Sequence, residues 1–569
     1  MIHSFLNRFT KNQATIYTLL LFSFFFIAYI LPLGERALFV PDETRYAEIP
    51  REMIASGDWG VPHLNGLRYF EKPPLGYWMN AASIVLFGEN VFAVRLPSAL
   101  AAGLTALMVF VLVGRVLRRH SGTQEDASIL AALIFLSCFE VFGVGNTAVL
   151  DTLFSFFLAA TIATFFLATE EPPGSWSERG FLLLAGLWCG HSFLTKGFLA
   201  FAIPALVLAP YLVWERRFRD LIRMSWLPLL AAVFLALPWA VFVHLREPDF
   251  WRFFFWNEHV RRFLSDSAQH KESFWYFFMA APGAFMPWTF LIPAALPGIG
   301  KRLNEAGPRG RLARFSVCWL SLPFLFFSVS SGKLLTYILP CFPPFAILLA
   351  FGLLHALGGN GRSRIFHWGV MGNALLFSFI LIALVGVQVF GYGGFHPYKH
   401  PWKMVMAVNA LAFFIVFCLW ALGEGGRMKK LVRIGLAPLL LFFMVNFIVP
   451  ESAGESKAPG PFLEKYASRV SCDDVVISDE STIGAVCWYL NRSDVYVLGN
   501  TGELEYGLKY EDASGRRLTQ RSLADLVKEN PGKTVVFTRN RKQPEWEDGL
   551  PHPVFQDDSG PSGYVFSQY

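Results

Sequence analysis

Charged residues are concentrated in the stretch 40–75, directly after the first long apolar segment of the chain. Only 16% of the chain is Asp, Glu, Lys or Arg, yet this stretch holds Asp42, Glu43, Arg45, Glu48, Arg51, Glu52, Asp58, Arg68, Glu71 and Lys72. Carboxylates alternate with cations, and Lys and Arg are the side chains that bind phosphate groups. Pro41 and the pair Pro73-Pro74 stiffen the two ends of the stretch. We expect a site that handles a phosphate here, although an ordinary polar loop would also carry charges.

Further polar residues flank apolar segments later in the chain. Asp151 opens the segment 151–168, where it is a helix N-cap, part of a site, or both. The loop 251–275 contains Glu258 and His259 close to Arg262. This cluster either caps a helix at a membrane surface or binds an anionic head group, and the planar forks of its arginines favour the second. Tyr337 follows soon after Lys333 and is either an interface tyrosine or a hydroxyl donor to phosphate.

The composition predicts the class of protein that contains these residues. The chain has 569 residues, 54% of them hydrophobic, and its repeated long apolar runs predict a polytopic membrane protein. The net charge of +6 is small, and no basic block interleaved with aromatics indicates nucleic-acid binding. The first apolar run, 15–33, lacks a clear cleavage site behind it and is interpreted as a retained anchor.

Thirteen apolar runs are long enough, or nearly so, to cross a bilayer. They must be helical there, because lipid offers no partners to backbone polar groups. The predicted spans are 15–33, 91–114, 127–143, 151–168, 180–194, 198–213, 226–245, 276–298, 315–329, 335–357, 367–390, 404–422 and 434–449.

The distribution of Lys and Arg predicts the orientation of these spans. With the amino terminus in the cytoplasm, five of the six connecting segments on that side are rich in Lys and Arg, as the positive-inside rule requires. The exception, 169–179, is acidic. The loops 35–90 and 246–275, and everything after the last span, are then expected outside. Lys196 also falls outside, where the rule disfavours Lys, and this favours a functional role for it.

The last part of the chain has a different pattern. After Pro459-Gly460-Pro461, short apolar runs such as 475–477, 495–498 and 534–537 alternate with helical patterns. This predicts a membrane domain over 1–450 and a small soluble α/β domain over 455–569. Seven cysteines show no C-x-x-C pattern of a metal site. Cys472 and Cys487 lie in the tail and either pair in an oxidising compartment or stay free.

Several of these motifs together resemble a known family. They are Pro41-Asp42-Glu43-x-Arg45-Tyr46, Glu71-Lys72-Pro73-Pro74, Asp151 at the start of a later span, Trp256-x-Glu258-His259-x-x-Arg262-Phe263 and Gly332-Lys333-Leu334-x-Thr336-Tyr337. They resemble the integral-membrane glycosyltransferases of the GT-C class, in the branch of protein O-mannosyltransferases and lipid A aminoarabinose transferases, and the second group is the more similar. The likeness covers the membrane part and the size and position of the tail.

The resemblance implies a fold, a reaction and a set of site residues. It implies thirteen membrane helices, a donor of 4-amino-4-deoxy-L-arabinose on undecaprenyl phosphate, and lipid A as acceptor at the periplasmic face of a bacterial inner membrane. It implies catalytic roles for Asp42 and Asp151, to which we add Glu43 and Lys72. Donor-phosphate binding is expected from Arg45, Lys72, Arg262 and Tyr337, with Lys196 as a further candidate. Glu71 and His259 resemble positions near a possible divalent metal, although some relatives need no metal.

Two alternatives remain open. A GT-C transferase could move another sugar, such as a mannose-like hexose, to a lipid, glycan or protein hydroxyl, which would need a general base. A lipid A phosphate is already ionised and needs none. A polyprenyl-lipid transporter would be expected to show internal repeats and broken midplane helices, which the sequence does not clearly show. We therefore expect an enzyme that also contacts membrane lipids.

Overall fold

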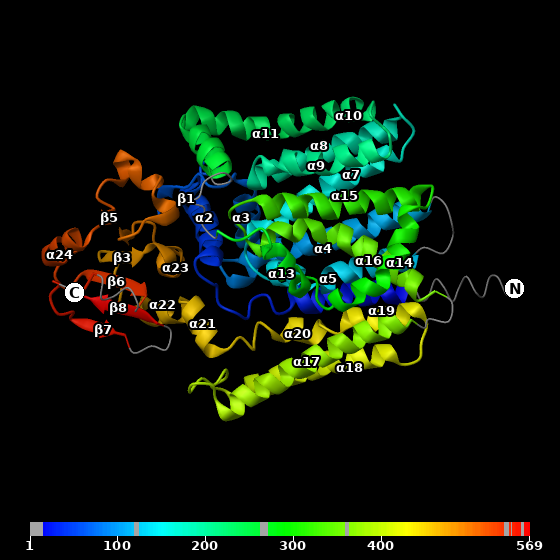
Figure 1. Cartoon of the computed structure of the whole chain (residues 1–569). Coiled ribbons are helices and arrows are strands. Elements are labelled where there is room, and N and C mark those ends of the chain that lie inside the picture. Colours follow the sequence, from blue (N-terminus) through cyan, green and yellow to red (C-terminus); the bar gives the residue numbers. More distant parts are fainter. Residues whose placement is uncertain are drawn as a thin grey trace.

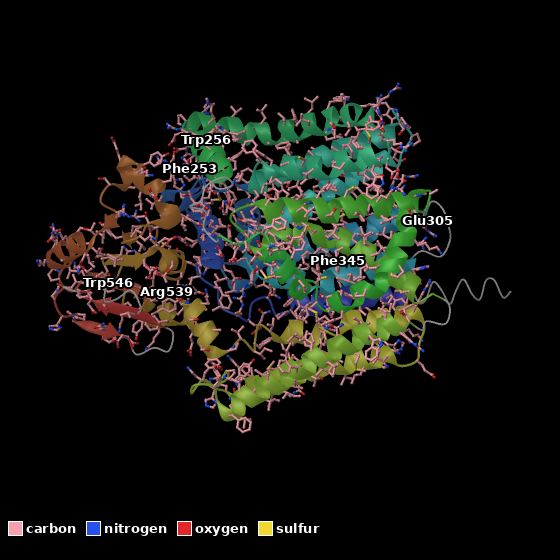
Figure 2. All side chains as sticks on the ribbon, viewed as in Figure 1. Phe253, Trp256, Glu305, Phe345, Arg539 and Trp546 are labelled. Carbon is pink, nitrogen blue, oxygen red and sulfur yellow. The ribbon has the colours of Figure 1, made fainter. Side chains whose placement is uncertain are left out.

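The computed structural model describes residues 15–118, 125–261, 271–358, 363–539, 546–547, 549–558 and 563–569. Long helices run side by side through one part of the molecule, and a sheet with shorter helices covers one end of them (Figure 1). Phe253 and Trp256 lie at the helix ends near the sheet, and Glu305 lies at the opposite end (Figure 2). The two ends of the helices are therefore different: among the described residues, only one end meets a folded domain.

The helical part is that of a polytopic membrane protein. Seven of the described helices are long and apolar enough to cross a bilayer, and two bent helix pairs raise this number to nine. Three shorter apolar helices, Thr15–Ile30, Leu75–Phe87 and Leu199–Trp214, add to them. The number of thirteen membrane spans stays a prediction. The described helices are α2 (Asp42–Ser56), α3 (Leu75–Phe87), α4 (Val91–Arg118), α5 (Glu125–Ser137), α6 (Phe139–Gly145), α7 (Leu150–Thr169), α8 (Trp176–Lys196), α9 (Leu199–Trp214), α10 (Asp220–Arg223), α11 (Trp226–Arg246), α13 (Tyr276–Ala284), α14 (Ile292–Leu303), α15 (Pro308–Val329), α16 (Phe342–Ala356), α17 (Arg364–Phe390), α18 (Pro401–Leu422), α19 (Arg427–Leu436) and α20 (Leu439–Met444).

Two of the predicted spans are sharply bent. The run 127–143 is broken at Cys138 with a bend of 64°, and the run 276–298 is broken before Thr289 with a bend of 95°. The two breaks face each other, because the N–H of Phe139 donates to the carbonyl of Met286 at 3.0 Å. The indole N–H of Trp288 also donates to the hydroxyl of Ser137 at 2.9 Å. The bond between Phe139 and Met286 thus pairs backbone groups at the two breaks, and the bond between Trp288 and Ser137 adds a side-chain contact beside it.

The stretch predicted as the first outer loop contains two helices, α2 and α3. Between them a two-residue turn at Asn65 and Gly66, both with positive φ, joins strands β1 (His63–Leu64) and β2 (Leu67–Arg68). Asn followed by Gly is favoured in such turns. The carboxylate of Glu52 accepts hydrogen bonds from the N–H groups of Asn65 and Gly66. This fixes the hairpin on α2 and leads the chain back to Glu71 and Lys72.

Glu43 anchors α2 to the membrane helices. Its buried carboxylate contacts Arg95 of α4 at 2.7 Å and Arg36 at 2.8 Å. It also accepts the N–H of Phe39 at 2.9 Å and that of Ala148 at 3.1 Å. Burial alone would raise the pKa of Glu43, but the two arginines outweigh it and lower the pKa to about 2. The carboxylate is therefore a charged link between α2, α4 and the segment that leads into α7.

The C-terminal residues form an α/β domain. Six strands are ordered β5-β4-β3-β6-β8-β7, with β3 to β6 parallel and β7 and β8 antiparallel to their neighbours. One face packs on α22 and α23, and the other packs on α24. The linker helix α21 (Glu451–Lys457) leads into the domain, whose elements are α22 (Gly460–Ala467), β3 (Val475–Asp479), α23 (Glu480–Leu490), β4 (Tyr496–Leu498), β5 (Arg517–Leu518), α24 (Gln520–Glu529), β6 (Thr534–Arg539), β7 (Phe555–Asp557) and β8 (Tyr564–Gln568).

The α/β domain packs directly on the stretch 40–75. Gly484 of α23 approaches α2 so closely that an added Cβ would lie 3.3 Å from the backbone nitrogen of Arg45. The amide of Asn65 donates to the carbonyl of Val495 at 2.7 Å. The hydroxyls of Tyr506 and Tyr510 both donate to Asp249, which lies just after α11. Contacts at several points thus hold the α/β domain against the helical part, and the boundary between the two is called the domain join below.

The two tail cysteines do not pair. Cys472 is exposed and Cys487 is buried, and both are free thiols. The Cys487 thiol instead donates to the side-chain oxygen of Asn65 at 3.4 Å. Of the two possibilities left open by the sequence, the structure has the unpaired one, because Cys487 faces α2 in the join between the domains.

Candidate active site

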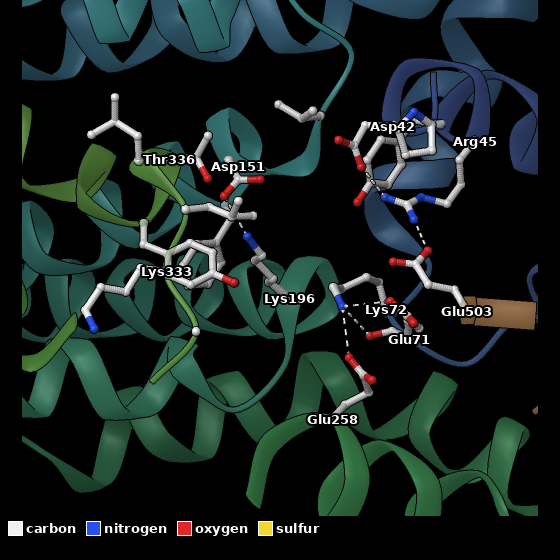
Figure 3. Close-up of a pocket in the computed structure, with 18 of the residues that line it drawn as sticks. Asp42, Arg45, Glu71, Lys72, Asp151, Lys196, Glu258, Lys333, Thr336 and Glu503 are labelled. Carbon is white, nitrogen blue, oxygen red and sulfur yellow. Dashed lines mark hydrogen bonds and ion pairs between the residues drawn. The ribbon is translucent and has the colours of Figure 1, made fainter. Parts of the chain in front are cut away.

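A cavity of about 630 Å³ lies where the α/β domain meets the helices. Its walls come from α2, the segment at Glu71 and Lys72, the start of α7, the end of α8, the 3₁₀ helix η4 (Leu335–Cys341) and the domain residues that follow β3 and β4. Figure 3 shows two groups of charged side chains facing each other across this space. One group contains Asp42, Arg45, Lys72 and Glu503, and the other contains Asp151 and Lys196.

Asp42 and Arg45 lie in the first turn of α2, directly after Pro41. Negative charge is favoured at this end of a helix. The guanidinium of Arg45 pairs with Asp42 and also with Glu503 of the 3₁₀ helix η5 (Gly502–Leu504). Glu503 also accepts the hydroxyl of Tyr69 at 2.8 Å, and burial raises the pKa of this hydroxyl well above its usual value. The side chain of Asp42 remains 58% exposed to the cavity side, so it is accessible to a substrate.

Lys72 lies between two carboxylates. Its ammonium is 3.3 Å from Glu258 of the π-helix η2 (Arg252–Arg261) and 3.7 Å from Glu71. It also donates to the Glu71 carbonyl at 2.9 Å. Two carboxylates therefore compensate the positive charge of this ammonium. No three metal-ligating side chains cluster in the described part of the chain.

Asp151 and Lys196 form the opposite group. The Lys196 ammonium donates to the Asp151 carboxylate at 2.7 Å and lies 5.4 Å from the ring of Tyr337. Asp151 is in the first turn of α7, whose N-cap is Val149 without a side-chain cap. The N-cap interpretation of Asp151 is therefore wrong, and its carboxylate contacts Lys196 instead. Lys196 is the last residue of α8, followed by Gly197 at φ 83°, which ends the helix.

Lys333 lines the cavity wall formed by the segment before η4, but its ammonium points into that segment. It donates to the carbonyls of Glu272, at 2.8 Å, and of Ser330. Burial lowers the pKa of Lys333 from its usual value. Thr336 and Tyr337 also line this wall. Tyr337, predicted to contact donor phosphate, is thus on the same wall as Asp151 and Lys196.

Not every predicted residue reaches the cavity. Glu43, taken as a catalytic candidate, is buried in its ion pairs with Arg95 and Arg36 and is not among the cavity residues. Arg262 lies outside the described residues, as does the side chain of His259. The predicted residues that do line the cavity are Asp42, Arg45, Glu71, Lys72, Asp151, Lys196 and Tyr337.

Sequence reasoning missed the contribution of the α/β domain. Glu480 follows β3 and Glu503 follows β4, two adjacent parallel strands, and both line the cavity. Residues after the carboxyl ends of parallel strands commonly form binding sites, so a strand assignment could have drawn attention to them. Lys457 of the linker helix α21 also lines the cavity, and nothing in its local sequence indicates this.

The charges and the apolar residues of the cavity indicate what it can bind. Its lining carries the cations Arg45, Lys72, Lys196, Lys333 and Lys457 and the carboxylates Asp42, Glu71, Asp151, Glu258, Glu480 and Glu503. Apolar residues, among them Phe154, Leu199, Phe326, Phe327 and Leu335, form the wall next to the membrane helices. Such a cavity suits an amphiphile with a head group that carries both signs of charge and an apolar chain on the helix side.

Two family descriptions match the chain. Residues 14–254 match dolichyl-phosphate-mannose-protein mannosyltransferase, and residues 454–566 match the C-terminal domain of the arabinosyl transferase ArnT. The first match includes α2 and the starts of α7 and α9, and the second includes the domain that supplies Glu503. The cavity residues of α2, α7 and the α/β domain therefore lie within matched regions, whereas Glu258 and the wall at Lys333 and Tyr337 lie between them.

The overall fold is similar to that of solved structures. ArnT from Cupriavidus metallidurans, crystallised with undecaprenyl phosphate, has a TM-score of 0.81 at 24% identity over 97% of this chain and 98% of that one. The apo form of the same protein has a TM-score of 0.80. These likenesses show that the chain has the polytopic fold of a membrane glycosyltransferase of the GT-C type.

Curated relatives are more similar in sequence. The undecaprenyl phosphate-alpha-4-amino-4-deoxy-L-arabinose arabinosyl transferase of Shewanella sediminis is 39% identical over 536 residues, which are 93% of this chain and 94% of that protein. The enzyme of the same name from Aeromonas hydrophila is 41% identical over 500 residues, covering 87% and 88%. The identity is high and extends over both domains, and the chain belongs to the family of undecaprenyl phosphate-alpha-4-amino-4-deoxy-L-arabinose arabinosyl transferases.

Proposed function

We propose that this protein transfers 4-amino-4-deoxy-L-arabinose from undecaprenyl phosphate to a phosphate of lipid A. The observation that carries the proposal is the cavity at the domain join, where an apolar wall of membrane helices meets two facing groups of ion pairs. A polyprenyl phosphate has the matching polarity, with an apolar chain on one side of a charged head. The relatives' shared name supplies the identity of the sugar.

The charge of the cavity supports an amino sugar over a neutral hexose. Six carboxylates line it against five cations in the described residues. A donor with a phosphate and an ammonium group presents both signs of charge, so both kinds of side chain gain a partner. A mannose-like sugar would offer no positive charge to these carboxylates. Among the carboxylates in the ion pairs described above for the cavity, that of Asp42 is the most exposed, and Asp42 is our candidate for contact with the sugar.

The cations of the cavity stabilise the leaving group in this proposal. As the bond from the anomeric carbon to the donor phosphate breaks, negative charge develops on the phosphate oxygen. Preorganised cations stabilise this charge more in the transition state than in the ground state. Lys72, Lys196 and the hydroxyl of Tyr337 line the cavity and are proposed to do this. Arg262 is proposed as an additional contact from the segment after η2.

The nucleophile needs little activation. A phosphate oxygen of lipid A is ionised near neutral pH, so it attacks without losing a proton to the protein. One C–O bond forms at the anomeric carbon, the bond to undecaprenyl phosphate breaks, and the electron pair leaves with that phosphate. Asp42 and Asp151 therefore orient substrates in this proposal and are not required to act as general bases. No step depends on a metal, although Glu71 and His259 remain candidate ligands.

We further propose the orientation in the membrane. The amino terminus and the basic ends of α4, α14 and α19 would face the cytoplasm, and the α/β domain, residues 455–569, would face the periplasm. The Lys and Arg distribution supports this. The thirteen spans predicted over 1–450 would bring the cavity to the periplasmic surface of the inner membrane. Cysteine labelling tests it: Asp42→Cys and Asp151→Cys, in a chain without Cys472, should react with an impermeant reagent from the same side.

Mass spectrometry of lipid A tests the function. Expression of the gene in a host that makes the donor but lacks its own transferase should add 4-amino-4-deoxy-L-arabinose to lipid A. An added hexose, or a modified protein or glycan with unmodified lipid A, would support the alternative GT-C transferase instead. Purified protein with radiolabelled donor and lipid A should transfer the label directly. Absence of transfer from a folded, donor-binding protein would overturn the proposal.

A further inference from the structure

A cation without a protein partner lines the cavity at the linker between the two domains. Lys457 is the last residue of α21, the helix that connects α20 to the α/β domain (Figure 1). Its side chain is exposed and lines the cavity. Within the described residues, no hydrogen bond or ion pair engages its ammonium. Lysine is a compact point charge that binds phosphate.

The other four cations of the cavity are engaged. Arg45 pairs with Asp42 and Glu503, and Lys196 pairs with Asp151. Lys72 and Lys333 have the partners described above, two carboxylates and two carbonyls respectively. An incoming phosphate must displace these partners or share the cation with them. Lys457 alone among the described cations of the lining offers its full charge without such a rearrangement.

The backbone holds Lys457 next to the proposed reaction centre. The N–H of Val40 donates to the carbonyl of Lys457 at 2.8 Å. Val40 is two residues before Asp42, and both line the cavity. The position of Lys457 is therefore set by a direct link to the turn that begins α2. A substitution of its side chain leaves this backbone hydrogen bond in place.

The position of Lys457 favours the acceptor over the donor. The donor phosphate carries a polyprenyl chain, so it must lie close to the apolar wall that contains Phe154, Leu199 and Phe327. Displacement at the anomeric carbon brings the nucleophile from the side opposite the leaving group. Lys457 comes from the linker beside the start of α2, and the apolar wall comes from α7, α9 and α15.

We propose that Lys457 binds the phosphate of the acceptor glycolipid and positions its oxygen for attack on the sugar. This inference rests on the proposed function, because it assumes transfer from one phosphate to another. The ligand is a phosphate monoester on a glycolipid head group. Lys457 compensates the negative charge of this phosphate, and the attacking phosphate oxygen then lies on the Asp42 side of the sugar.

Steady-state kinetics of the full-length protein in lipid nanodiscs test the proposal. Lys457→Gln should raise the KM for lipid A about tenfold, the loss expected for one charge-assisted hydrogen bond near the surface. The KM for the donor and the affinity for undecaprenyl phosphate should not change. Lys457→Arg should keep the KM for lipid A within about threefold of the unsubstituted protein, because arginine also binds phosphate. The matched control is Lys465→Gln on α22, which removes an exposed lysine that pairs with Asp557 outside the cavity lining.

The outcomes separate this inference from the function itself. If the unsubstituted protein transfers no sugar to lipid A, the proposed function fails. If it does, and Lys457→Gln leaves the KM for lipid A unchanged or weakens undecaprenyl phosphate binding instead, Lys457 is not the acceptor contact. Lipid A lacking one or both phosphates gives an independent check. The substitution should lose its effect on KM with an acceptor whose bound phosphate has been removed.

Discussion

The carboxylate of Asp151 and the ammonium of Lys196 meet at 2.7 Å, one at the start of α7 and the other at the end of α8. Each charge also complements the dipole of its own helix, negative at an N-terminus and positive at a C-terminus. The pair therefore satisfies three electrostatic preferences at once. Because the two side chains line the cavity, they also present a preorganised dipole to the head group of a substrate.

The charge-swapped variant Asp151→Lys/Lys196→Asp tests the role of the helix ends. The swap restores an ion pair but places a cation at the start of α7 and an anion at the end of α8, which the dipoles oppose. We expect transfer to stay at least about tenfold below that of the unsubstituted protein. Full recovery of activity in a transfer assay would show that pairing alone matters. The single variants Asp151→Asn and Lys196→Gln complete the cycle.

Asp42→Asn should abolish sugar transfer and leave the protein folded in the membrane. Its carboxylate faces the cavity and is the candidate contact to the sugar, so loss of its charge should reduce kcat at least about a hundredfold. The measurement is single-turnover transfer to lipid A, with expression level and thermal stability as checks of folding. Asp494→Asn serves as the control, because Asp494 is equally exposed and lies outside the cavity lining. Normal transfer by Asp42→Asn would remove Asp42 from the mechanism.

Lys72→Gln should weaken donor binding. The ammonium between Glu71 and Glu258 is proposed to contact the donor phosphate, and its loss should raise the dissociation constant of undecaprenyl phosphate about tenfold. The neutral substitution is preferable to charge reversal, which would place a third carboxylate beside the other two. Equilibrium binding of a labelled polyprenyl phosphate measures the effect. Unchanged affinity would exclude Lys72 as a phosphate contact.

Glu503→Gln should reduce transfer although Glu503 belongs to the α/β domain. An amide binds the Arg45 guanidinium more weakly than a carboxylate, so Arg45 should be less well held beside Asp42. We expect a loss of about tenfold in kcat/KM. Glu505→Gln, two residues further on and exposed, should have no effect. Equal effects of both substitutions would point to general destabilisation of the domain.

Acidification should destabilise the fold through Glu43. Its pKa is lowered from 4.5 to about 2 in the folded state, so the contribution of its charge is present above pH 4.5 and is lost as the pH falls toward 2. The shift corresponds to about 3 kcal/mol. Thermal unfolding midpoints in detergent, followed from neutral pH downward, should fall across this window. Glu43→Gln should be much less stable at neutral pH, since it leaves Arg95 buried without its charge partner, and should lose part of the acid dependence.

The sequence predicted the class of fold and many of the charged residues that line the cavity. Apolar runs predicted the helices, and motif residues such as Asp42, Lys72 and Asp151 do line one cavity. The bends at Cys138 and before Thr289 could not be predicted from apolarity, because they depend on a hydrogen bond between two distant segments. The helix Leu75–Phe87 was missed because it is shorter than a membrane span.

The ion pairs within the site could not be predicted from the sequence either. Arg45 and Glu503 are 458 residues apart in the chain, and no local pattern joins them. Glu43, next to Asp42 in the same motif, points toward Arg95 and Arg36 and acts as an anchor. Neighbours on a helix face different directions, so a motif alone cannot separate a catalytic carboxylate from a structural one.

The ion pair between Arg45 and Glu503 couples the two domains, so exchange of either domain alters the cavity. A chimaera that carries the α/β domain of a distant relative would also carry that relative's residues in one wall of the cavity. Selectivity for the sugar would then depend on the origin of the tail as well as on that of the helices, and matched residues at positions 45 and 503 would be needed for full activity of such a hybrid.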